Sequence, residues 1–314
     1  MNAKRAREIL RRVVRQLAIT LPAVWLVLTM VFLLAHIVPG DPVQQMLGED
    51  ARAEDLSQLR HALGLDLPLH TQYARYFAGL LRGDWGRSFR YQAPVLPMVL
   101  QRYPATLELA LAAMLVCCAI AIPAGVAAAR RRGRAADHAI GVLTLFGLSV
   151  PNFALGPVLI LVFSIGFGWL PVSGRGGIAH LVLPAATLGA ALAAILTRMV
   201  RGAMIEELSS DYVRTARAKG LSERAVLYRH AFPNALVPIL TILGLQFGAL
   251  LAGTIVTESI FAWPGIGRLT VQAIQGRDYP LLQGCILAIA LSYVIVNLLT
   301  DSAYALVDPR IRLS

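Results

Sequence analysis

The chain has 314 residues, of which 57% are apolar and 15% are charged, and its formal net charge is +11. A soluble domain carries roughly 25% charged residues, so this composition argues against a water-soluble globular protein and for one that crosses a lipid bilayer repeatedly. Neither of the two lysines, Lys4 and Lys219, is followed by Ser or Thr after a glycine-rich run. This excludes a P-loop for a nucleoside triphosphate.

Six apolar segments are long enough to cross a bilayer, which takes about 20 residues of helix. The first could be mistaken for a signal peptide because a basic stretch precedes it. It lacks a small-x-small cleavage site and five more segments follow, so we interpret it as a membrane anchor. The six predicted spans are residues 17–38, 105–129, 139–168, 181–200, 236–261 and 282–307.

Basic residues are distributed unevenly between the two sides of these spans. Nineteen of the 29 lysines and arginines lie at the termini, between spans two and three, or between spans four and five. The short connections on the other side carry only Arg175, Arg268 and Arg277. Because Lys and Arg collect on the cytoplasmic side, we expect both termini in the cytoplasm. The excess of positive charge is therefore explained by membrane topology and not by nucleic-acid binding.

This topology predicts four segments along the chain. They are a cytoplasmic N-terminus with the first span at 1–38, an extracytoplasmic loop at 39–103, a five-helix core at 104–307 and a cytoplasmic tail at 308–314. Within the long loop, amphipathic patterns predict two short helices, which end near Gly64 and Gly83. These helices suit either packing on the membrane surface or docking of an external protein.

The third predicted span contains prolines, which remove a backbone donor and displace a carbonyl from the helical ladder. Freed carbonyls inside a membrane are tolerated where they meet protein or a water-filled path. We therefore expect a kinked helix that lines a pathway, with Ser149, Pro151 and Asn152 as candidates. A merely tilted long helix is the alternative.

Two carboxylates, Glu108 and Glu258, fall near the outer ends of spans two and five. Ionisable groups inside a membrane are costly and are candidates for function. Both are expected to be shallow enough to reach lipid headgroups or water, and both are kept as pathway candidates. An ion pair between Glu258 and Arg268 is the alternative hypothesis. No cluster has metal-ligand spacing and no nucleophile has a paired base, so neither a metal site nor a catalytic site is expected.

The connection between spans four and five, within residues 206–233, has the pattern of a helical elbow. A serine pair predicts the cap of a helix that begins at Asp211, and Gly220 is suited to end it. Ser222 predicts the cap of a second helix, and Pro233 either ends that helix or begins the fifth span. An elbow tied to membrane spans at both ends is suited to receive a push from a cytosolic partner.

This elbow resembles the EAA loop of ABC importer permeases, in which Glu-Ala-Ala is followed by glycine and then by Ile-x-Leu-Pro. Ala216, Gly220 and Pro233 match the pattern, whereas Arg214 and Thr215 replace the glutamate and the first alanine. Further motifs in chain order resemble the first permease subunit of the dipeptide/oligopeptide/nickel ABC importers, over nearly the whole chain. They are residues 39–42 (PGDP), 83–88 (GDWGRS), 104–109 (PATLEL), 149–153 (SVPNF), 212–221 (YVRTARAKGL), 261–268 (FAWPGIGR) and 308–312 (DPRIR).

The resemblance implies an all-α polytopic membrane protein with six transmembrane helices in the type I ABC importer permease architecture, located in a bacterial or archaeal cytoplasmic membrane. It implies a homologous second permease, two cytosolic ABC ATPases that bind ATP and Mg, and an extracytoplasmic substrate-binding protein. This chain itself is expected to bind no cofactor. The residues that would couple it to an ATPase are Asp211, Arg214, Thr215, Ala216, Arg217, Lys219 and Gly220. The basic residues would pair with acids, while Ala216 and Gly220 would permit close backbone approach.

Short peptides are the expected substrates. Nickel chelates, glutathione and sugars are alternatives, because specificity would lie mainly in the binding protein and not in this chain. Two rival classes of membrane protein would need other sequence features. An intramembrane hydrolase needs a nucleophile with a paired base, and a stand-alone secondary transporter usually shows internal repeats and paired charges at the midplane. The sequence displays neither pattern.

Overall fold

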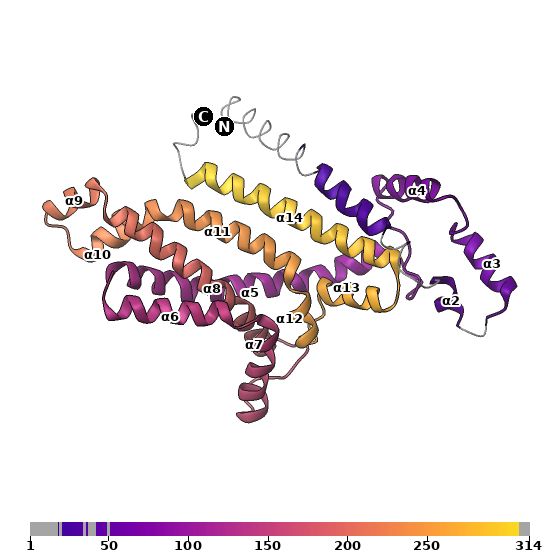
Figure 1. Ribbon diagram of the computed structural model, residues 1–314, viewed down its shortest axis with the longest axis horizontal. Helices are drawn as coiled ribbons and strands as arrows, with labels where there is room; N and C mark the ends of the chain where they lie inside the picture. Colours follow the sequence, from indigo (N-terminus) through magenta and orange to yellow (C-terminus); the bar gives the residue numbers. More distant parts are fainter. Residues whose placement is uncertain (1–17, 19–20, 34–35, 37–41, 49–50, 308–314) are drawn as a thin grey trace. The chain divides into compact units, whose positions relative to one another are not determined.

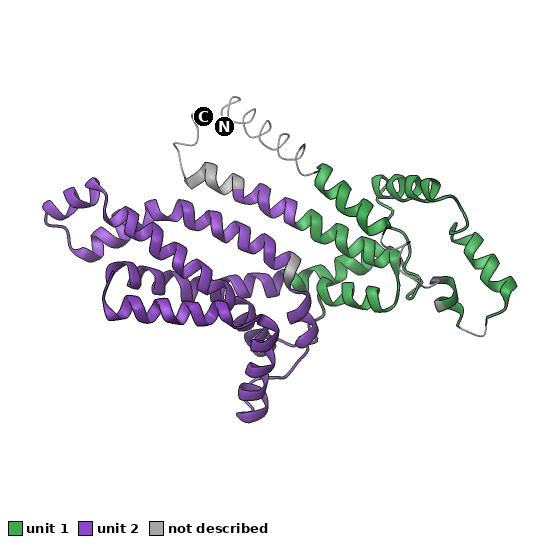
Figure 2. Ribbon diagram, in the orientation of Figure 1, with its two compact units in different colours: residues 1–106, 264–292 green, residues 107–263, 293–314 purple. Residues whose placement is uncertain are grey.

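The computed structural model describes residue 18, residues 21–33, residue 36, residues 42–48 and residues 51–307. Within this part of the chain the elements are helices, and the β structure is limited to an isolated antiparallel bridge between Arg87 and Pro94. The all-helical prediction is therefore confirmed. The chain divides into two compact units, residues 1–106 with 264–292 and residues 107–263 with 293–314, which Figure 2 colours separately.

The first unit contains the apolar helix Leu21–Leu33 and the short helices of the predicted outer loop. The two amphipathic helices expected there are confirmed as α3 and α4. The unit also includes the first part of α5, all of α13 and the beginning of α14. Its labelled helices are α2 (Pro42–Leu47), α3 (Ala53–Ala62), α4 (Leu69–Leu81), α5 (Val95–Arg130), α13 (Ile266–Gln275) and α14 (Tyr279–Val307).

The second unit is built around α8, which packs against α6, α7, α11 and α12 (Figure 1). It also holds the later parts of α5 and α14. Its other elements are α6 (Ala135–Ser149), α7 (Asn152–Leu159), the π-helix η1 (Ile160–Gly166), α8 (Ile178–Leu208), α9 (Asp211–Ala218), α10 (Glu223–Ala225), the π-helix η2 (Val226–Ala231), α11 (Phe232–Gly253) and α12 (Ile255–Ile260).

Glycine allows close helix contact in this unit, as expected where lipid supplies little hydrophobic drive between helices. A Cβ atom on Gly189 of α8 would lie 2.7 Å from the carbonyl oxygen of Ala113 and 2.8 Å from Cβ of Val116, both on α5. A Cβ atom on Gly244 of α11 would overlap the side chain of Thr300 on α14. These contacts leave no space for a side chain at either glycine.

Four described helices are long and apolar enough to cross a membrane: α5, α8, the continuous helix Glu223–Leu251, and α14 over Tyr279–Thr300. The bent pair formed by α6 and residues 152–166 makes a fifth. The helix Leu21–Leu33 is apolar but shorter, and the rest of the first predicted span lies mostly outside the described residues. Helix α5 begins at Val95, ten residues before its predicted span.

The third span bends by 98° between Ser149 and Asn152. Val150 is extended, with φ −86° and ψ 114°, because the residue before a proline is disfavoured in the α conformation. The expected kink is confirmed, and it separates α6 from α7 completely. Beyond the second proline, Pro157, the helix widens into the π-helix η1.

The fifth predicted span, residues 236–261, differs from the observed helix at both ends. The helix begins inside the elbow at Glu223 and reaches Leu251 as one apolar segment. Pro233 lies in the first turn of α11, directly after the π-helix η2 ends at Ala231, and its missing N–H does little harm there, so it marks the start of the α11 part of this span as predicted. After Gly253 the chain turns at Thr254 into the short helix α12.

Candidate coupling elbow and pathway residues

The elbow connects α8 to α11 through α9, α10 and η2, which Figure 1 shows at one end of the second unit. Helix α9 begins at Asp211 as predicted, but the hydroxyl of Ser210 donates to the carbonyl of Glu207 at 2.6 Å instead of capping α9. Ser222 does cap the next helix, accepting from the N–H of Ala225 at 3.4 Å. The elbow therefore consists of a helix, a glycine turn and a second helix, as predicted.

Helix α9 is held against its own chain by Val213 and Ala216, which are 0% and 6% exposed. They lie one turn apart on the same face of the helix. They belong to one core cluster with Met204 of α8 and with Val226 and Leu227 of η2. Ala216 thus permits close approach of α9 to its own chain, and its role in coupling to an ATPase stays a prediction.

Tyr212 adds a polar contact between α9 and the neighbouring helices, and its role was not recognised from the sequence. Its hydroxyl donates to the carboxylate of Glu207 at the end of α8, and it lies 3.5 Å from the carbonyl oxygen of His230 in η2. Burial raises the pKa of the Tyr212 hydroxyl, so this group remains a donor. Together, the apolar and polar contacts attach α9 to α8 and to the helix that begins at Glu223.

The opposite face of α9 is charged and exposed. The side chain of Arg214 is 81% exposed and lies 3.5 Å from the carboxylate of Asp211, one turn earlier. Arg217 Nε lies 2.8 Å from Glu223 Oε1, which joins the two arms of the elbow across the glycine turn. Arg217 therefore has a partner within this chain. Exposed pairs of this kind contribute about 0.2–1 kcal/mol, so they orient side chains more than they stabilise the elbow.

Gly220 has φ +78°, in the left-handed region that favours glycine. A Cβ atom at this position would meet nothing within 4 Å among the described residues. Its role in this chain is therefore conformational, as predicted for the end of α9. Thr215 and Lys219 are exposed next to it, with the Thr215 hydroxyl donating to the carbonyl of Asp211 at 3.0 Å.

The candidates in the third span lie at its bend. The Ser149 hydroxyl donates to the carbonyl of Leu145 at 2.9 Å, and Pro151 precedes α7, whose first residue is Asn152. Ser149 and Pro151 are exposed and Asn152 is half-buried. Their exposure is compatible with a pathway surface, and the pathway role itself stays a prediction.

Glu108 on α5 forms an ion pair that the sequence did not indicate. Both Nε and Nη2 of Arg175, in the loop before α8, donate to its carboxylate, the first at 2.9 Å. The guanidinium carbon of Arg175 also lies 5.9 Å from the ring centre of the buried Trp263. The Glu108 side chain is 36% exposed, which agrees with the expected access to water.

Glu258 is fully buried, and this corrects the prediction that it is shallow enough to reach headgroups or water. The Thr254 hydroxyl donates to its carboxylate at 3.0 Å, and its backbone carbonyl accepts from the N–H of Trp263 at 2.8 Å. The physical reason is that α11 ends at Gly253. Glu258 therefore lies on the separate short helix α12, which packs against α7 and α8, and not on a continuation of the span. Its pairing with Arg268 stays a prediction.

A second ion pair was missed because its arginine was counted only as a topology signal. Asp137, in the first turn of α6, is 6% exposed. Its two carboxylate oxygens accept from Arg201 Nε at 2.6 Å and Nη2 at 2.8 Å, and one also accepts from the N–H of Gly133 at 2.9 Å. This bidentate pair joins α6 to the end of α8 that leads into the elbow.

Comparison with known proteins decides the family. Residues 121–313 match the model of the binding-protein-dependent transport system inner membrane component, and residues 6–110 match the model of its N-terminal part. The chain belongs to this family. It is therefore a permease subunit of an ABC importer and a multi-pass protein of the inner membrane.

Curated relatives cover almost the whole length of this permease. It is 42% identical over 303 residues to the glutathione transport system permease protein GsiC of Salmonella paratyphi A and to that of Escherichia coli K12. In each comparison the match covers 96% of this chain and 99% of the relative. The resemblance inferred from the motifs is thereby confirmed.

A solved structure supports the fold. Inward-facing conformations of the MetNI methionine ABC transporter match with TM-scores of 0.58 and 0.57 at 16% and 17% identity. These matches cover 67% and 68% of this permease and 96% and 97% of the matched chains. The importer permease architecture that the motifs implied is therefore confirmed.

Proposed function

We propose that this permease forms half of the translocation pathway of an ATP-driven importer for short peptides delivered by a binding protein. The other half would be a homologous permease, and two cytosolic ATPases would bind ATP and Mg. Family membership supports this division of labour. The basic residues near the termini support cytoplasmic positions for both ends of the chain.

The names of the relatives sharpen the proposed substrate. Glutathione is a tripeptide, so a glutathione permease lies within the proposed class, and glutathione is the first compound to test. Nickel chelates and sugars are the alternative substrates. The binding protein would select among these substrates, and this chain would conduct what the binding protein delivers.

The elbow supplies the observation on which the proposed coupling rests. Val213 and Ala216 anchor α9 to α8 and η2, while Arg214 and Lys219 lie on its exposed face. Closure of the ATPases would push on this exposed face, and the anchored face would pass the movement to two membrane helices. The partner's closure would thus favour one of two packings of the membrane helices.

Transport by the reconstituted complex tests this proposal. The full chain and its partner subunits are placed in vesicles with the binding protein, and ATP-driven uptake of labelled glutathione, a dipeptide, a nickel chelate and a disaccharide is compared. We expect uptake of glutathione or the dipeptide. Uptake of the nickel chelate or the disaccharide alone would contradict the peptide proposal, and uptake by this chain without ATPases would contradict ATP-driven import.

A charge reversal at the elbow tests the coupling separately. Arg214→Glu should lower ATP-driven uptake about tenfold, the effect of losing roughly 1.4 kcal/mol of interaction with an acidic groove. The matched control is Arg132→Glu, at an exposed arginine in the turn between α5 and α6. Equal losses in both variants, with the complexes assembled to the same extent, would contradict a specific role for α9.

A further inference from the structure

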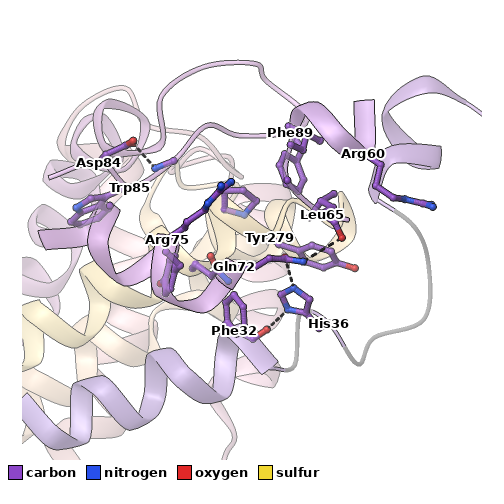
Figure 3. A pocket seen from close by; sticks show the side chains of 17 residues that line it. Phe32, His36, Arg60, Leu65, Gln72, Arg75, Asp84, Trp85, Phe89 and Tyr279 are labelled. Atoms are coloured by element: carbon purple, nitrogen blue, oxygen red, sulfur yellow. Dashed lines mark hydrogen bonds between the residues drawn. The ribbon is translucent and has the colours of Figure 1, made fainter. Parts of the chain in front are cut away.

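A pocket of about 610 Å³ lies in the first unit, at the end of the apolar helix Leu21–Leu33. Its walls come from this helix, from α3–α4, from residues 84–89 and from the beginning of α14. The volume is in the range of about 300–1,000 Å³ that small-molecule sites occupy. In the view of Figure 3, the Arg75 side chain extends between the wall with Trp85 and the wall with Phe89.

The charged groups in this lining are mainly positive. Arg60 and Arg75 line the pocket, and Nη1 of Arg75 lies 3.3 Å from the position of a Cβ atom on Gly64, so this guanidinium lies against the turn after α3. Asp84 is the only acidic residue among the described lining residues, and one of its oxygens accepts from the N–H of Gly86 at 2.9 Å. Asp66 lies near Arg75 but is hydrogen-bonded to His61 at 2.6 Å, outside the lining.

His36 presents both ring nitrogens to oxygen atoms. Nδ1 lies 2.7 Å from the carbonyl oxygen of Phe32, and Nε2 lies 3.1 Å from Oε1 of Gln72. The amide nitrogen of Gln72 donates to the carbonyls of Leu67 at 2.8 Å and Leu65 at 3.3 Å, which sets the orientation of this amide. These contacts hold the His36 ring in place at the edge of the pocket.

The hydroxyl of Tyr76 is buried and has no hydrogen-bond partner within the described residues. Its ring stacks on Phe32, with the centroids 5.9 Å apart, and burial raises the pKa of the hydroxyl, so it remains protonated. A buried donor without an acceptor is unfavourable, and a ligand oxygen in the pocket would satisfy it.

The adjoining helix has an exposed apolar surface. Large apolar side chains of the helix Leu21–Leu33, including Trp25 and Met30, are exposed in the described structure, as expected for a surface in contact with lipid. The pocket lies where this apolar surface ends, and lipid headgroups are expected at the end of an apolar surface that faces a membrane. Arginine pairs with phosphate through parallel N–H donors.

We propose that the pocket binds the phosphate of an anionic phospholipid, with Arg75 and the Tyr76 hydroxyl as donors to its oxygens. The acyl chains would lie along the exposed apolar surface of the helix Leu21–Leu33. A lipid bound in this way would join the first membrane helix to α4, independently of the substrate that the importer carries.

Native mass spectrometry of the assembled transporter tests this proposal. Phosphatidylglycerol is titrated against phosphatidylcholine with the same acyl chains, and we expect selective retention of phosphatidylglycerol. Arg75→Ala should weaken this retention about tenfold and Tyr76→Phe a few fold, as expected for the loss of a charged and a neutral donor. Arg82→Ala is the matched control, because Arg82 follows α4 but does not line the pocket.

Three results would overturn the proposal. The first is that Arg75→Ala and Tyr76→Phe both retain phosphatidylglycerol as well as the unmodified transporter does. The second is that Arg82→Ala loses as much retention as Arg75→Ala. The third is that soluble glycerol phosphate competes at the concentration at which the lipid binds. The last result would identify a soluble phosphate ester as the ligand in place of a lipid. Thermal unfolding without added lipid shows whether each variant is folded, and Arg75→Lys replaces Arg75→Ala if the alanine variant is not.

Discussion

Helix α8 contacts its neighbours in two different ways along its length. Near its beginning, Gly189 brings α5 into direct contact with the backbone. At its other end, Met204 meets Val213 and Ala216 of the elbow, while Arg201 pairs with Asp137. The first region tolerates no added atoms, whereas the second combines a small apolar contact with polar groups at the surface. The helices are therefore closely packed around Gly189, whereas the elbow has an accessible outer face.

The largest expected effect comes from adding a side chain in the first region. Gly189→Leu should destabilise the assembled permease by about 3 kcal/mol or more, because the new atoms overlap Val116 and the carbonyl of Ala113. The measurement is the thermal midpoint and the yield of assembled complex. Gly202→Leu on the same helix is the control, since a Cβ atom there meets nothing within 4 Å among the described residues. Similar losses in both variants would remove the distinction between the two regions.

A smaller loss is expected in the second region, at the ion pair between Arg201 and Asp137. Asp137→Asn should cost about 2 kcal/mol, because it removes the charged acceptor of Arg201 and leaves a buried polar group with weaker partners. Thermal unfolding of the complex measures this loss. The double variant Asp137→Asn, Arg201→Gln separates the pair from other effects. A double variant whose loss equals the sum of the two single losses would show that the pair does not couple α6 to α8.

The smallest effect is expected within the elbow. Arg217→Ala should change stability by less than about 1 kcal/mol, because its pair with Glu223 is exposed. Its effect on uptake is more informative. A loss of uptake that Glu223→Ala reproduces would assign the pair to holding the elbow's shape, whereas a loss only in Arg217→Ala would favour a contact with the ATPase.

Much of the elbow could be predicted because its signals are local. Asp211 at the first turn of α9, Gly220 in a left-handed turn and Ser222 as a cap depend on residues a few positions apart. The bend at Pro151 is local for the same reason, although its size of 98° was not predicted. What each face of α9 contacts was not predictable, because Val213 and Ala216 pack against residues from α8 and η2.

The sequence by itself determined the membrane class, most of the apolar spans and the importer family, because composition, hydrophobic length and ordered motifs are properties of the chain alone. Only the tertiary structure decided that Glu258 is buried, that Glu108 pairs with Arg175 and that Asp137 pairs with Arg201. Each of these outcomes depends on where a helix ends and which distant helix lies beside it. The two ion pairs join residues that are 64 or more positions apart in the sequence, and no local sequence pattern predicts such a pairing.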